Sequence, residues 1–470
     1  MFIVKDKYQL RDLVINGDLT NDTLDIYDYS DITDFSGLFQ NCTYLKEVPL
    51  LNTKHVIDMS YMFAGCKNLK KIPNFNTENV VSFDYMFQQC TSLETIPDFD
   101  VPNVVSMSHM FSQCFCLIES PSFKNTQNLA ETSYMFSYCN NLEKINLFDT
   151  SFVYDFEGMF LNCSNLKYLP HFNTENVTNL NFTFKGCNSL RKIPHFDTSM
   201  VTTMNASFED CYNLDTIPLI DTHFVKDTSF LFHNCLNLEK IPLINLSKVT
   251  SSNSMFKNCQ EINYINSLNL LSCKNMSNMF EGCKKLKHIG YLDTSSVSIL
   301  DYTFKDCINL KHLPEINTPK LRSMIEMFSG CQKIEFIPHF NTSNVNNMDK
   351  AFKNCEYMIN FPNFDTSRVF TMKGTFENCY KLEKMPLLDT SSVDNFESTF
   401  ENCISLSQIT FYEVDENSHF DNIFKNCFSL PLYDIIPFLK NESNNLFKRE
   451  FYKNMSIEEL EKIHNELYEY

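Results

Sequence analysis

The sequence contains no tryptophan and only nine glycines among its 470 residues. An average protein has about 7% glycine, so glycine-rich phosphate-binding loops are not a dominant feature of this chain. Basic residues are also in deficit, with 39 Lys and Arg against 58 Asp and Glu and a formal net charge of −19. This balance disfavours binding to nucleic acid or to an anionic membrane through a general basic surface.

Long hydrophobic runs are missing as well. No apolar stretch approaches the roughly 18 residues of a membrane-spanning helix, so none is predicted and no membrane insertion is expected. At the amino terminus, Lys5, Asp6 and Lys7 interrupt the apolar core that a secretory signal needs. Hydrophobic residues nevertheless make up 43% of the chain. That content is sufficient for a core and excludes a disordered chain.

An internal repeat dominates the sequence. Seventeen cysteines follow one another at a constant step of twenty-four positions, except for one step of twenty-five between Cys114 and Cys139, and each has a Phe three positions before it. We call them the seam cysteines: Cys42, Cys66, Cys90, Cys114, Cys139, Cys163, Cys187, Cys211, Cys235, Cys259, Cys283, Cys307, Cys331, Cys355, Cys379, Cys403 and Cys427. A fixed period of this length indicates a repeat architecture in which each unit packs on its neighbours.

One part of the unit has the periodicity of a helix. Met59, Met62, Phe63 and Cys66 fall at positions i, i+3, i+4 and i+7. This spacing places four apolar side chains on one face and predicts a helix of about two turns.

A short extended segment follows in each unit. In the unit of Cys66 it runs through Leu69 to Ile72 and meets Pro73, and a proline occupies the same place in 12 repeats. Proline has no N–H for a sheet ladder, so the strand should end there. The Asn76-Thr77 pair that comes next is typical of a turn.

Twenty-four residues bury too little apolar surface to fold alone, because ordering them costs more free energy than about eight buried side chains return. We therefore predict an α/β repeat solenoid with about 17 coils of 24 residues. Short parallel strands should form one face and short helices the other. The predicted parts are an N-terminal cap over 1–31, the solenoid over 32–430 and a C-terminal helical cap over 431–470.

Each cap is predicted to contain a helix. The first helix is expected near Asp6–Val14. The second follows a capping box of Ser456 and Glu459. Its apolar face comprises Ile457, Leu460, Ile463 and Leu467. This second helix either closes the solenoid or mediates dimerisation, and the oligomeric state stays open.

The seam cysteines are expected to be buried free thiols. Stacked helices would hold neighbouring cysteines too far apart for a disulfide, and no cysteine or histidine spacing fits a zinc site. Reduced thiols favour the cytoplasm or another reducing compartment. Two further cysteines lie outside the seam: Cys273 is expected in the core, whereas Cys116 is expected at the surface, as a neutral residue or as a reactive thiol.

No catalytic motif is present, so we expect no enzyme, no cofactor and no metal site. His171 and His195 share one slot in adjacent repeats, as do His288 and His312, but no carboxylate completes a ligand set. Surface imidazoles are the simpler interpretation of both pairs.

Function should then depend on exposed positions of the strand face that vary between repeats. Aromatic, imidazole and basic residues follow one another there, and such side chains often anchor interfaces. Unselected surface variation is the alternative. The predicted contact stripe comprises Tyr168, Arg191, Lys192, Tyr264, His288, His312 and Phe336.

Segments such as MSYMFAGCKNLKKIPNFNTENV and VTSSNSMFKNCQEI, together with ITDFSGLFQNC at the start of the repeats, resemble the BspA-like leucine-rich-repeat surface proteins. Their units have the form M-x-x-M-F-x-x-C-x-x-L-x-x-L, and the resemblance extends over residues 32–430. It implies a leucine-rich-repeat solenoid without catalysis that binds host-cell or matrix proteins, which is an adhesion role.

Two functions are therefore considered. The first is a non-catalytic protein–protein interaction solenoid with a protein partner of unknown identity. The alternative is a structural or scaffold component of a viral particle or surface assembly, displayed on a cell or virion by a non-classical route.

Overall fold

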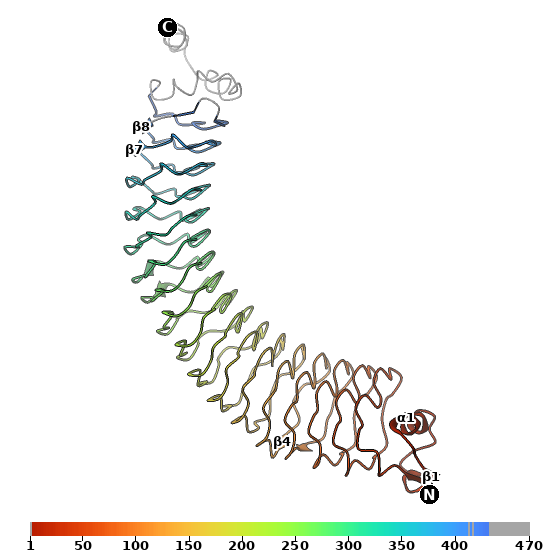
Figure 1. Ribbon diagram of the computed structural model, residues 1–470. Coiled ribbons are helices and arrows are strands. Elements are labelled where there is room, and N and C mark those ends of the chain that lie inside the picture. Colours follow the sequence, from red (N-terminus) through yellow and green to blue (C-terminus); the bar gives the residue numbers. More distant parts are fainter. Residues whose placement is uncertain (1, 412–413, 416–417, 432–470) are drawn as a thin grey trace. The chain divides into compact units, whose positions relative to one another are not determined.

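The computed structural model describes residues 2–411, 414–415 and 418–431. These residues form coils that follow one another along the chain (Figure 1). By compactness the chain divides into two units, Met1–Leu238 and Glu239–Tyr470. The described repeats of each unit form a stack of successive coils (Figure 1). The predicted repeat solenoid is confirmed. The C-terminal helical cap predicted over 431–470 lies outside the described residues, apart from Pro431.

Regular elements are few and short. Those of the first unit are β1 (Phe2–Ile3), α1 (Lys7–Ile15), η1 (Leu24–Ile26), β2 (Tyr27–Asp28), β3 (Phe99–Asp100) and β4 (Phe123–Lys124). Those of the second unit are β5 (Tyr264–Ile265), β6 (His288–Ile289), β7 (Lys384–Leu388) and β8 (Gln408–Phe411). Within the described residues, no helix is long and apolar enough to cross a bilayer.

Helix α1 is the helix that the sequence predicts near the amino terminus. The Asp6 carboxylate accepts hydrogen bonds from the backbone N–H groups of Tyr8 and Gln9, which satisfies two donors of the first turn. Leu10 and Val14 form the buried side of the helix. Before and after it, β1 and β2 pair in parallel.

The predicted short parallel strands are confirmed. β3 pairs with β4, β5 with β6 and β7 with β8, always between neighbouring coils and in parallel. Elsewhere single parallel bridges join the same position from coil to coil, as between Lys71 and Thr95. The prediction that the strand ends at proline is wrong at β7, the longest strand, which runs through Pro386. The two-residue strands β5 and β6 are followed by Asn266 and Gly290 instead.

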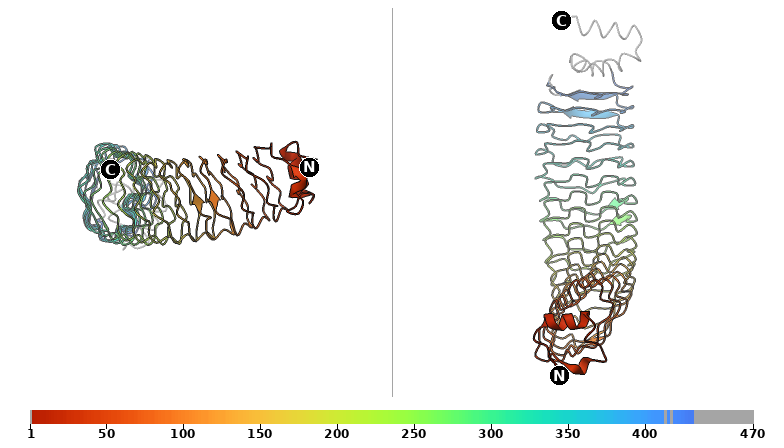
Figure 2. Two further views of the ribbon diagram at one scale, coloured as in Figure 1. Left: turned by 90° about the horizontal axis from the view of Figure 1, so that it is seen from below. Right: turned by 90° about the vertical axis from the view of Figure 1, so that its right-hand side faces the viewer.

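A second ladder lies on another side of each coil, and the sequence did not predict it. It joins Asp58 to Ser82 and Ser82 to Ser106, and it continues coil by coil. Figure 2 shows these coils side by side within each unit.

The short helices expected on the face opposite the strands are absent from the described coils, and this part of the prediction is wrong. Consecutive turns take their place. The backbone N–H of Met62 donates to the carbonyl of Met59 at 3.2 Å, and that of Cys66 donates to Phe63 at 3.0 Å. Both bonds span three residues, as in a β-turn, rather than the four of an α-helix.

Hydrogen bonds between coils explain why the turns are not wound into a helix. The N–H of Phe63 points away from its own coil and donates to the carbonyl of Met86 in the next coil at 2.9 Å. Tyr61 and Gly65, the third residues of two successive turns, have positive φ angles of 57° and 76°. Positive φ at that place is the mark of a type II turn, and it turns alternate N–H groups toward the neighbouring coil.

The core runs along each stack between the strands and the turns. The phenylalanines that precede the seam cysteines are buried and lie ring on ring. Phe63 and Phe87 have ring centroids 5.5 Å apart and nearly parallel planes, and Phe87 and Phe111 repeat this at 5.4 Å. Such contacts add to the free energy gained by burying the rings. A coil therefore completes its core only when a neighbour lies on each side.

Candidate functional site: the strand-face column

The residues of the predicted stripe lie on the strand face of the coils. We call the position five residues after each seam cysteine the strand-face column. Its side chain faces solvent, and in many coils its backbone pairs with the neighbouring coil, as at β5 and β6, where Tyr264 pairs with His288 in register. His312 and Phe336 occupy the same column outside any strand or bridge. The next residue, Ile265 or Ile289, points into the core. This alternation exposes a row of side chains on a rigid backbone.

Four members of the stripe occupy this column in successive coils of the second unit. Tyr264 is 50% exposed and Phe336 is 54% exposed, values that are high for aromatic side chains. His288 and His312 lie between them in sequence and are exposed as well. Each of the four positions therefore presents its side chain on the same face.

The other members of the stripe belong to the first unit. Tyr168 is 71% exposed and bridges Lys144 in the preceding coil. Arg191 is one position before the column, and its guanidinium is paired with the Asp215 carboxylate at 2.8 Å. Lys192 is exposed in the column itself. The two groups of residues lie in separate compact units and are treated as separate surfaces.

Sequence analysis missed two basic residues beside the second group. Lys287 and Lys311 directly precede His288 and His312, and both are exposed. The signal was the Lys-His dipeptide, which recurs one repeat later in positions that vary elsewhere. The significance of this dipeptide for binding depends on which lysines of the strand face have acidic partners, and only the structure shows those pairs.

The seam cysteines are free thiols, as predicted. Their thiols donate hydrogen bonds to the preceding coil, in the seam from Cys66 to Cys235 and from Cys283 to Cys427. The acceptor is always the carbonyl oxygen of the phenylalanine that lies 27 or 28 residues earlier. At Cys66 the Sγ–O distance is 3.1 Å. Each thiol thus satisfies a buried carbonyl, a role that the sequence did not reveal.

Burial also determines the chemistry of these thiols. It raises the pKa of Cys66, Cys139 and Cys283 to about 12, because a thiolate would be poorly solvated in the core. A thiol that stays protonated is neither a nucleophile nor a metal ligand. Outside the seam, Cys273 is buried and Cys116 is exposed, in agreement with both predictions.

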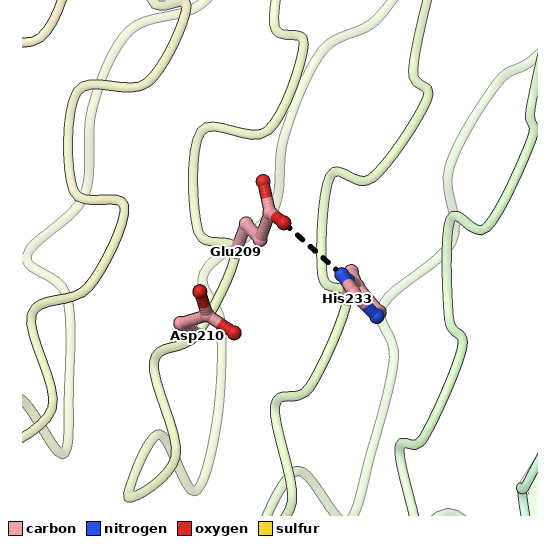
Figure 3. Close-up of side chains that lie close together, drawn as sticks. All are labelled: Glu209, Asp210 and His233. Atoms are coloured by element: carbon pink, nitrogen blue, oxygen red, sulfur yellow. Dashed lines mark hydrogen bonds and ion pairs between the residues drawn. The ribbon is translucent and has the colours of Figure 1, made fainter.

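Glu209, Asp210 and His233 bring three potential ligand atoms within 4.8 Å of one another on the turn side of the first unit (Figure 3). His233 Nδ1 lies 3.1 Å from one oxygen of Glu209, and Lys185 Nζ lies 2.7 Å from the other. Burial raises the pKa of Glu209, but hydrogen bonds from His233 and Lys185 outweigh it and lower the pKa. Both carboxylate oxygens are engaged, so the group is explained as an ion-pair network between coils.

Comparison with known proteins gives the family. Solved structures of leucine-rich-repeat proteins are similar to this chain. One from Bacteroides ovatus ATCC 8483 has 19% identity and a TM-score of 0.44, over 76% of this chain and 88% of its own. A leucine-rich cell surface protein from Faecalibacterium prausnitzii A2-165 has 15% identity and a TM-score of 0.34, over 77% and 84%. One from Eubacterium ventriosum ATCC 27560 has 14% identity and a TM-score of 0.29, over 73% and 81%.

Because these TM-scores are below 0.5, we assign the fold from the stacked coils themselves and not from these similarities. None of the curated proteins matches the chain. One family model matches it repeatedly, over residues 9–122, 120–217, 162–267, 261–359 and 322–434. These matches cover most of the sequence and the whole of the repeat region. The chain therefore belongs to the family described as Mycoplasma protein of unknown function, DUF285.

Proposed function

We propose that the chain is a non-catalytic protein-interaction solenoid that binds a protein partner through its strand-face column. The observation that carries this proposal is the exposure of Tyr264 and Phe336 in one column, in which pairing with the neighbouring coil fixes the backbone at Tyr264. Aromatic side chains that are already held in place lose little conformational entropy on binding, so they suit an interface.

Other parts of the proposal rest on the seam and on the repeat motif. The buried, protonated thiols support a reducing compartment. The M-x-x-M-F-x-x-C unit supports the alternative location, a cell surface reached by a non-classical route, with a BspA-like adhesion role in which the partner is a host-cell or matrix protein. We also propose that 1–31 and 431–470 cap a solenoid over 32–430, since the ends of a repeat stack need atypical, polar coils.

Affinity capture from the native source, quantified by mass spectrometry, tests the interaction. A variant with Tyr264, His288, His312 and Phe336 changed to alanine should recover the partner poorly. A control with Lys274, Arg322 and Phe370 changed to alanine removes exposed side chains from a different column of the same unit and should recover it fully.

Equal recovery by the two variants would refute the strand-face site. Co-sedimentation of the native chain with a particle, without a separable partner, would instead indicate the alternative function, a scaffold component of a viral particle or surface assembly.

A further inference from the structure

Four basic residues on the strand face of the first unit are paired with acidic residues one coil away, whereas Lys46 and Lys192 make no ion pair with a described residue. Such pairs neutralise the face locally, although each contributes little stability when exposed. The pairs and their N–O distances are Lys70–Glu94 at 3.1 Å, Lys144–Glu119 at 2.6 Å, Lys167–Glu143 at 3.0 Å and Arg191–Asp215 at 2.8 Å.

Lys287 and Lys311 in the second unit differ from these four paired residues. They occupy the same position in adjacent coils, about 4.8 Å apart along the stack, and neither makes an ion pair with any residue that the structure describes. Like charges at neighbouring positions repel each other. With His288 and His312 beside them, they form a locally basic surface on a chain whose formal net charge is −19.

Aromatic side chains border this basic surface at both ends. Tyr264 lies in the coil before it and Phe336 in the coil after it, and both are half exposed. Glu335, next to Phe336, confines the positive charge to the two central coils. We call these six residues the basic–aromatic patch: Tyr264, Lys287, His288, Lys311, His312 and Phe336.

We infer that the basic–aromatic patch binds an extended acidic segment of a partner protein, with carboxylates opposite the lysines and apolar side chains against the two aromatic rings. This inference rests on the proposed function and specifies the chemistry of its partner. The patch spans three coil steps, about 15 Å, which an extended chain covers in about five residues. Complementary charge at such a surface provides specificity and speeds association.

A short peptide suits the patch better than a larger polyanion does. Nucleic acid or an anionic bilayer extends well beyond the ends of the patch and would meet the acidic surface around it, where repulsion opposes binding. A segment of about five residues places its carboxylates within the basic region alone, since charges beyond about 8 Å are screened at physiological salt.

The test uses the full chain and a fluorescein-labelled peptide in which Glu alternates with Leu over nine residues. Fluorescence anisotropy should show binding of this peptide, whereas the matched peptide with Gln in place of Glu should bind at least about tenfold more weakly. Raising the salt concentration should weaken binding, because attraction to the patch is screened. If repulsion by the net charge of −19 dominated instead, added salt would strengthen binding and overturn the inference.

Charge reversal locates the site. The Lys287→Glu, Lys311→Glu double variant should bind the Glu peptide at least about tenfold more weakly than the native chain. The control is the Lys46→Glu, Lys70→Glu double variant, which changes the same position in two adjacent coils of the first unit and the net charge by the same amount. It should bind within about twofold of the native chain, because exposed charges more than a Debye length from the peptide are screened.

Equal loss in the two variants would show a general charge effect and overturn the inference. Stronger binding to vesicles containing phosphatidylserine, or to a single-stranded oligonucleotide, than to the Glu peptide would overturn it too. Failure here is distinguishable from failure of the proposed function. The strand-face site would hold without the acidic ligand in one case. In that case the native chain captures a partner, the Tyr264/His288/His312/Phe336 alanine variant loses it, and the Lys287→Glu, Lys311→Glu variant retains it.

Discussion

Replacement of Phe208 by alanine tests the stacked core of the first unit. The Phe208 ring is 3% exposed and lies between two parallel rings, with centroids 5.4 Å from Phe184 and 5.6 Å from Phe232. Truncating a buried Phe costs about 3–5 kcal/mol through lost transfer free energy and the cavity left behind. Because both ring contacts also disappear, we expect a value near the upper end of that range.

The free energy of unfolding is measured by urea denaturation, and hydrogen exchange locates the effect. Exchange should increase in the coils on either side of Phe208, because each coil is stabilised mainly by its neighbours. The matched control is Phe152→Ala in the same unit, where the ring is 62% exposed and the expected change is within about 0.5 kcal/mol. A loss below about 1 kcal/mol for Phe208→Ala, or equal losses for the two variants, would refute burial of the ring column.

Three further predictions follow from the same packing. Cys211→Ala removes the thiol that donates to the carbonyl of Phe184 and should lower the free energy of unfolding by about 1–3 kcal/mol. A melting temperature equal to that of the native chain would contradict this. Alkaline pH should destabilise the fold, because burial raises the pKa of the Cys66, Cys139 and Cys283 thiols to about 12, whereas unfolded cysteines ionise near pH 8.5. Above that pH about 1.4 kcal/mol is lost per such thiol and pH unit up to about pH 12, and urea midpoints that do not change between pH 8 and 10 would exclude this. Gly158→Ala should lower the melting temperature more than Gly17→Ala. Both glycines have positive φ, but only at Gly158 would a Cβ lie 2.3 Å from the Tyr134 ring. Equal shifts in melting temperature would show that this contact is unimportant.

The period of the cysteines was sufficient to predict stacked coils, because a unit as short as one repeat has no other way to complete its core. It was not sufficient to predict the turns. Met59, Met62, Phe63 and Cys66 fit one face of a helix, yet successive type II turns bury the same four side chains. A signal was available in the residue before each seam cysteine, which is usually Asn or Gly, as at Gly65. These residues tolerate positive φ, and a helix interior would disfavour them.

The candidate site was predicted only in part, for a physical reason. The aromatic and imidazole positions followed from their place in the repeat, since the residue before a buried strand residue must face solvent. The significance of Lys287 and Lys311 did not follow, because it depends on whether acidic side chains of neighbouring coils reach them. The role of the thiols as donors also depends on a contact between coils, as in the hydrogen bond from Cys66 to Phe39.

Counting reactive thiols under native conditions tests the central claim of a buried seam most directly. Mass spectrometry after brief alkylation should show rapid modification of the exposed Cys116 and protection of the buried seam cysteines from Cys42 to Cys403, while denaturation should make all nineteen cysteines reactive. Rapid modification along the seam of the native chain, or disulfides between seam positions, would contradict the stacked structure.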